Sequence, residues 1–101
     1  MEIKYRNKKI EKICSDYSYA VKKYNVDMAN KIVQRVNELS AADTVEQMVQ
    51  NHIGRCHALS ENRKNQYALD LIHPYRLIFV RLGNIVEILQ AVEIQEIVDY
   101  H

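Results

Sequence analysis

The sequence predicts an α+β fold, and three patterns carry that prediction. Residues 27–41 place apolar side chains at the three- and four-residue spacing of an amphipathic helix. Residues 66–72 and 75–81 alternate between apolar and polar side chains, and residues 85–98 form a β-branched apolar run. Both patterns are typical of strands. Because the helical patterns come first, we expect N-terminal helices packed on one face of a mainly antiparallel sheet.

Shorter elements flank the main helix. Residues 1–5 alternate polar and apolar side chains, which predicts a short opening strand. Three further short helices should begin after side chains that can accept a hydrogen bond from the first helical turn. These expected capping residues are Asn7, Ser15 or Asp16, and Asp43.

Turn signals separate the expected strands. His73-Pro74 interrupts the alternating pattern, because proline cannot donate a hydrogen bond in a central strand. Gly83-Asn84 is a hairpin signal. The run over 85–98 is long for one strand, so we expect a bulge or bend near Gln90-Ala91. The later strands should therefore follow one another as an antiparallel meander.

Size and composition limit the class of protein. A chain of 101 residues with 48% apolar residues can build one core, so residues 1–101 are expected to form a single domain. Its two cysteines do not make a disulfide framework, and no secretory signal pattern is present. No apolar run approaches the roughly 20 residues of a membrane-spanning helix. We therefore expect a cytoplasmic protein with no membrane partner.

Charge is spread unevenly along the chain. Residues 1–36 hold nine lysines and arginines against four acids, a net charge of +5. Residues 85–101 hold four acids and no base. The basic half permits contact with a polyanion on one face. A solvated helical surface explains the same charges, so charge alone does not decide between the two.

Side chains that can transfer protons or hold charge occur at three places in the second half. His57 and Arg76 are two of them, and the third is the end of the last strand pattern. The unperturbed pKa of histidine, about 6.5, lies near cellular pH. The planar fork of arginine can donate two parallel hydrogen bonds to a phosphate. The group at the strand end consists of Asp99, Tyr100 and His101.

Two other kinds of site can be weighed at Cys56. Its neighbour His57, with Cys14 and His52, suggests a metal site, but the spacing of a zinc site with about four ligands is absent. Cys56 as a nucleophile lacks an evident paired base or oxyanion hole. We therefore expect no metal and no cofactor. His52 and His73 are interpreted as structural or surface residues.

Four segments resemble the RelE/HigB superfamily of toxins from bacterial toxin–antitoxin pairs, in particular the HigB branch, the plasmid-maintenance killer proteins. The resemblance covers nearly the whole chain, and the fold that it implies is RelE-like. The family commonly has glycines where this chain has Glu61 and Asn65, and asparagine tolerates the left-handed backbone that such a turn needs. The matching segments are residues 6–12, 56–69, Pro74-Tyr75-Arg76-Leu77-Ile78-Phe79 and Glu96-Ile97-Val98-Asp99-Tyr100-His101.

The resemblance implies an endoribonuclease that cuts mRNA on the translating ribosome. RNA can be cut without a metal because its 2′-OH is a built-in nucleophile, so the enzyme needs a base, an acid and positive charge. In this interpretation His57 and His101 form the proton-transfer pair, and either one could be the base. The remaining roles are charge stabilisation by Arg76, nucleotide orientation or stacking by Tyr100, orientation of a histidine or basic group by Asp99, and RNA-backbone binding by Arg63 and Lys64.

The resemblance also implies partners and leaves alternatives. The expected partner is a helix-turn-helix antitoxin of the HigA type, and operator DNA would be bound only through the antitoxin complex. One alternative is an interaction module whose catalytic groups have decayed. Another is an inhibitor of translation or replication that does not cut RNA. The retained set of His57, Arg76, Asp99, Tyr100 and His101 favours the nuclease.

Overall fold

The computed structural model describes residues 1–60, 65–83 and 90–99. Its five strands form one sheet in the order β1-β5-β4-β3-β2, and every pairing is antiparallel except that of β1 with β5. The helices are α1 (Lys8–Ser15), α2 (Tyr17–Lys23), α3 (Val26–Ala41) and α4 (Val45–Gln50), with a 3-10 turn η1 (Ile53–Arg55). The strands are β1 (Glu2–Tyr5), β2 (His57–Ala58), β3 (Gln66–Asp70), β4 (Tyr75–Leu82) and β5 (Ala91–Asp99).

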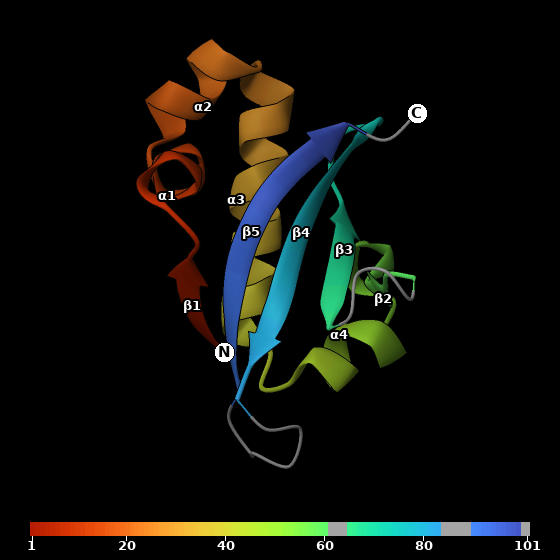
Figure 1. Ribbon diagram of the computed structural model, residues 1–101. Coiled ribbons are helices and arrows are strands. Elements are labelled where there is room, and N and C mark those ends of the chain that lie inside the picture. The colour runs from red at the N-terminus through yellow and green to blue at the C-terminus, as the bar shows by residue number, and fades with distance from the viewer. Residues whose placement is uncertain (61–64, 84–89, 100–101) are drawn as a thin grey trace.

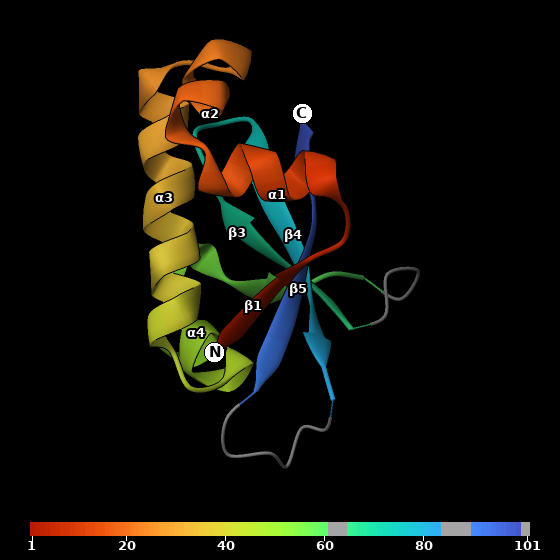
Figure 2. The ribbon, with the colours of Figure 1, turned by 90° about the vertical axis from the view of Figure 1, so that its left-hand side faces the viewer.

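The helices gather on one side of the sheet, which confirms the predicted α+β fold. Figures 1 and 2 show α3 running along one face of β5, β4 and β3. The first two helices lie beside the β5 edge, above the end of β1. In the described part of the chain no helix covers the opposite face, which we call the open face. None of the described helices is long and apolar enough to span a membrane.

The core lies between α3 and the sheet. Alternate side chains of the strands face the helices, among them Leu69, Leu77 and Phe79, and each is fully buried. They pack with buried side chains of α3 such as Ile32 and Leu39. Burying a side chain of this size contributes about 1.5–3 kcal/mol. The two periodicities in the sequence therefore meet in one core.

Most helix starts follow the predicted capping chemistry. Asn7 Oδ1 accepts a hydrogen bond from Ile10 N at 2.9 Å, and Asp16 Oδ1 accepts one from Tyr19 N at 3.1 Å. The prediction that Asp43 caps α4 is wrong. Thr44 is the cap, because its Oγ1 accepts from Gln47 N at 3.2 Å, while the Gln47 side chain accepts from Asp43 N at 2.9 Å. The cap therefore lies one residue later than expected, and Gln47 accepts from the residue before it in place of the N-cap N–H of a capping box.

Bulge placement also departs from the prediction. The pairs Ile78–Glu96 and Phe79–Ile94 leave Gln95 as the extra residue, so the bulge lies there and not at Gln90-Ala91. Gln90 is buried just before β5, and its Oε1 accepts from Val45 N at 3.0 Å. Gln90 thus links the start of β5 to α4.

Candidate active site

The open face brings together polar side chains from strands that are distant in sequence. Directly paired residues of neighbouring antiparallel strands place their side chains on the same face. The cross-strand pairs define two rows on the open face. One row is His57, Ala68, Ile78 and Glu96, and the other is Asp70, Arg76 and Val98.

His57 is held by a local hydrogen bond. Its Nδ1 donates to the backbone carbonyl of Arg55 at 2.7 Å, and the ring is partly buried on the two-residue strand β2. This bond orients the imidazole and leaves Nε2 as the ring atom for proton transfer. A hollow of about 420 Å³ adjoins the ring and is lined by His52, Arg55, Cys56 and His57.

Arg76 is anchored by Asp70, directly across the β3–β4 hairpin. Arg76 Nε lies 3.5 Å from Asp70 Oδ1, and Arg55 Nε donates to Asp70 Oδ2 at 2.5 Å. Asp70 also accepts a bond from Arg35 Nε of α3 at its backbone carbonyl, 2.7 Å away. A single carboxylate therefore positions two guanidinium groups, and the local charge stays positive beside His57.

The spacing of His57 and Arg76 suits a phosphodiester placed between them. The two residues lie on strands β2 and β4, with β3 between them, and their rows are two residues apart. Strand spacings of about 4.8 Å and rises of about 3.4 Å per residue put their Cα atoms roughly 12 Å apart. A histidine and an arginine at that separation can approach one phosphate group from two sides.

The cysteines do not supply a nucleophile. Cys56 is buried, and burial raises the pKa of its thiol to about 12. The thiol therefore stays protonated near neutral pH. Burial raises the pKa of Cys14 to about 12 as well. Within residues 1–60, 65–83 and 90–99, no three histidine, cysteine, aspartate or glutamate side chains are grouped as metal ligands would be.

The remaining expected site residues fall at or beyond the ends of the described segments. Asp99 is exposed and pairs with Tyr75, one position past the Arg76–Val98 pair, so its backbone register places it on the helix side of the sheet. The backbone of Asn65 is left-handed, with φ of 63°, as expected from the sequence for this turn. Arg63, Lys64, Tyr100 and His101 lie outside the described residues, and their roles stay predictions.

Sequence reasoning missed three contributors to this site, namely Asp70, Arg55 and His52. Asp70 had a usable signal, because a hairpin folded about His73-Pro74 pairs it with Arg76 and the alternating pattern puts both on one face. Arg55 and His52 have left-handed φ values of 51° and 54° around η1. Irregular backbone of that kind has no periodicity to reveal it.

Comparison with known proteins gives a fold and no family assignment. No family model matches the chain, and no curated protein sequence matches it either. One similar solved structure is a YoeB/ParE toxin from Agrobacterium tumefaciens, with a TM-score of 0.56 over 100% of this chain and 99% of that chain. The chain shares the fold of that toxin. At 13% identity the similarity establishes the fold alone, and it does not single out the HigB branch.

Proposed function

We propose that the chain is the toxin of a type II toxin–antitoxin pair and acts as an endoribonuclease on mRNA. The proposed setting is the translating ribosome in the cytoplasm, and the proposed branch is HigB. The fold shared with a YoeB/ParE toxin supports the first part. One arrangement supports the second, namely the oriented ring of His57 on the same face as the anchored guanidinium of Arg76.

The proposed reaction is attack of the RNA 2′-OH on the adjacent phosphorus. A base takes the 2′-OH proton, the O2′–P bond forms, and the P–O5′ bond breaks while an acid protonates the leaving 5′-oxygen. The products are a 2′,3′-cyclic phosphate and a 5′-hydroxyl end. His57 and His101 are the proposed acid and base, and Arg76 stabilises the extra negative charge. Each proton-transfer group typically contributes about 10²- to 10⁴-fold.

Partners follow from the same proposal. A HigA-type helix-turn-helix antitoxin would neutralise the toxin, and operator DNA would be contacted through that complex. Arg63 and Lys64 are proposed to hold the mRNA backbone.

A second candidate is a toxin or interaction module that binds its target without cutting RNA. One observation favours it: Asp70 lies in an ion pair with Arg76, so a phosphate must compete with a carboxylate for that guanidinium. Competition of this kind weakens phosphate binding but leaves the arginine oriented. The two candidates differ in whether new RNA ends appear.

Induced expression followed by mapping of mRNA 5′ ends separates the candidates. Wild type and His73→Ala should produce new ends inside translated frames, since His73 is an exposed histidine outside the open-face rows. His57→Ala should inhibit growth less than the wild type does, and it should produce none of these new ends. Growth arrest without new ends in the wild type would favour the binding-only candidate.

A further inference from the structure

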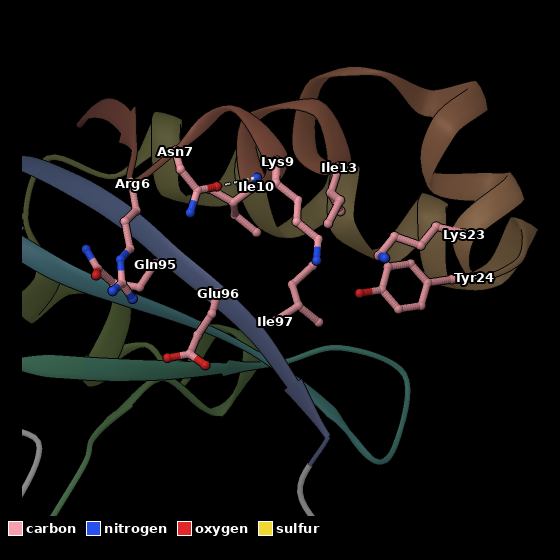
Figure 3. Close-up of a pocket in the computed structure, with 10 residues that line it drawn as sticks. All are labelled: Arg6, Asn7, Lys9, Ile10, Ile13, Lys23, Tyr24, Gln95, Glu96 and Ile97. Carbon is pink, nitrogen blue, oxygen red and sulfur yellow. Dashed lines mark hydrogen bonds between the residues drawn. The ribbon is translucent and has the colours of Figure 1, made fainter.

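A groove lies on the other side of the molecule, between α1, the end of α2 and the second half of β5. Its volume is about 380 Å³. Its apolar wall is made by Ile10 and Ile13 of α1, both buried, and by Ile97 of β5. Figure 3 shows Ile10 and Ile13 on the two sides of Lys9 and Ile97 below it, with Lys23 and Tyr24 at the right-hand end. The groove is separate from the hollow around His57.

The sheet edge beside this groove is covered over only half its length. β1 pairs with β5 from Ala91 to Ile94, whereas β5 continues to Asp99. Figure 2 shows the chain leaving the sheet after β1 and entering α1. Among the described residues, no strand continues β1 along the rest of β5.

The ladder alternation shows which backbone groups face that edge. Leu71 N donates to Tyr75 O at 3.0 Å, so the backbone of Tyr75 faces β3. Every second residue of a strand faces the same neighbour, so Leu77, two residues after Tyr75, also directs its N–H and C=O toward β3. Arg76 and Ile78 then bond to β5 through Val98 and Glu96. The N–H and C=O of Ile97, which lies between those two, therefore point away from β4 toward the groove edge.

Positive charge surrounds the groove. Arg6, Lys9 and Lys23 line it at exposed positions, and Glu96 is the one carboxylate among its ten lining residues. The excess of two cations favours an anionic partner. The isoleucine wall and the strand edge favour a polypeptide over a nucleic acid, because neither feature offers a contact to a sugar–phosphate backbone.

We propose that this groove binds an extended acidic segment of a partner protein, which adds to the sheet as a short strand beside Ile97. Backbone hydrogen bonds to Ile97 fix the segment in place. Alternate apolar side chains pack on Ile10 and Ile13, and the intervening carboxylates face Lys9 and Lys23. The proposal does not depend on ribonuclease activity, because its contacts involve neither His57 nor Arg76.

A charge-reversal pair tests the site. The probe is a fluorescein-labelled nine-residue peptide that alternates glutamate with valine, and its binding to the full chain is followed by anisotropy. Lys9→Glu with Lys23→Glu should weaken binding about tenfold or more, since two attractive contacts become repulsive. The matched control is Lys8→Glu with Lys22→Glu, exposed lysines of the same two helices outside the groove lining, which should change affinity less than about threefold.

A backbone change tests strand addition. The same peptide with alternate nitrogens methylated cannot donate to the strand edge, and it should bind about tenfold more weakly because two hydrogen bonds are lost. Amide exchange at Ile97 should slow when the unmodified peptide binds. Tight binding with unchanged exchange at Ile97 would overturn the strand geometry.

Three outcomes would contradict the proposal that an acidic peptide segment occupies the groove. The first is no measurable binding of the acidic peptide by a folded chain. The second is a single-stranded uridine decamer that binds with the same dependence on Lys9 and Lys23 and slows exchange at Ile97, which would make the groove an RNA site. The third is a dimer of the chain alone that the same charge reversals dissociate, which would make a second copy the occupant.

Discussion

The two polar regions of this molecule hold their cations in different ways. On the open face, Arg76 and Arg55 share Asp70, and the Arg76 side chain is only 30% exposed. At the β5 groove, Arg6, Lys9 and Lys23 all lie at exposed positions on short helices or a turn. A cation fixed by a carboxylate can stabilise charge at one defined point. Exposed lysines attract a partner over a wider area and fix no single atom. The open face is therefore suited to chemistry and the groove to association.

Among the cations of the two regions, Arg76 should have the largest effect. Arg76→Gln removes the guanidinium proposed to face the scissile phosphate, and the rate of RNA cleavage should fall about 10²- to 10³-fold. Arg55 is the other partner of Asp70, and the Arg55 side chain is 69% exposed. Arg55→Gln should therefore lower the cleavage rate about tenfold or less. Single-turnover cleavage of a labelled mRNA on ribosomes measures both. Equal losses would contradict the assignment of the phosphate to Arg76.

Asp70→Asn should separate positioning from charge. The amide keeps the shape of the carboxyl group but leaves Arg76 and Arg55 without their shared anion. Urea unfolding should show a loss of about 1–2 kcal/mol in the free energy of unfolding. RNA should bind more tightly at low salt, while the rate of the cleavage step falls about tenfold because Arg76 is no longer oriented. A variant that cleaves at the wild-type rate would show that the ion pair does not position Arg76.

Cys56→Ala should leave cleavage within about twofold of wild type, because a thiol with its pKa raised to about 12 supplies no thiolate at neutral pH. Burial raises the thiol pKa above its ordinary value of 9.0 in the folded chain. The unfolded chain therefore loses its thiol protons first, and stability should fall as pH rises from about 9 toward 12. Cys14 acts in the same direction, so Cys14→Ala with Cys56→Ala should flatten this dependence. Urea titrations at pH 8 and 10 measure it.

The smallest effect on cleavage should come from the groove. Lys9→Glu with Lys23→Glu should leave RNA cleavage within about twofold of wild type while it weakens binding of the acidic peptide. Both lysines line the groove beside β5, whereas His57 lines a different hollow beside β2. A large loss of cleavage in this variant would show that the groove and the open face act together as one RNA-binding surface.

Sequence patterns were sufficient for the parts of the fold that repeat. The periodic apolar spacing predicted α3, and alternation predicted the strands β3 and β4. It did not predict burial, because Ala68 and Ile78 on the open face are also fully buried. The parallel pairing of β1 with β5 was missed, because pairing between residues about 90 positions apart leaves no local signal. β2 was missed because two residues are too few to show a period.

In the candidate site, too, some residues could be predicted from sequence patterns and others could not. His57 and Arg76 stood out by residue type, and strand alternation fixed the face that Arg76 occupies. Asp70 required the hairpin pairing as well, because its importance comes from its neighbours and not from its own position. His52 and Arg55 depend on left-handed backbone around η1, which no pattern in the sequence indicated.

The nature of the RNA ends tests the central claim most directly. mRNA from cells expressing wild type, His57→Ala or His73→Ala can be sorted by whether each new 5′ end carries a hydroxyl or a phosphate. We expect new 5′-hydroxyl ends within translated frames for wild type and His73→Ala, and none for a folded His57→Ala variant. New ends that carry a 5′-phosphate, or 5′-hydroxyl ends that persist in His57→Ala, would contradict attack by the 2′-OH assisted by His57.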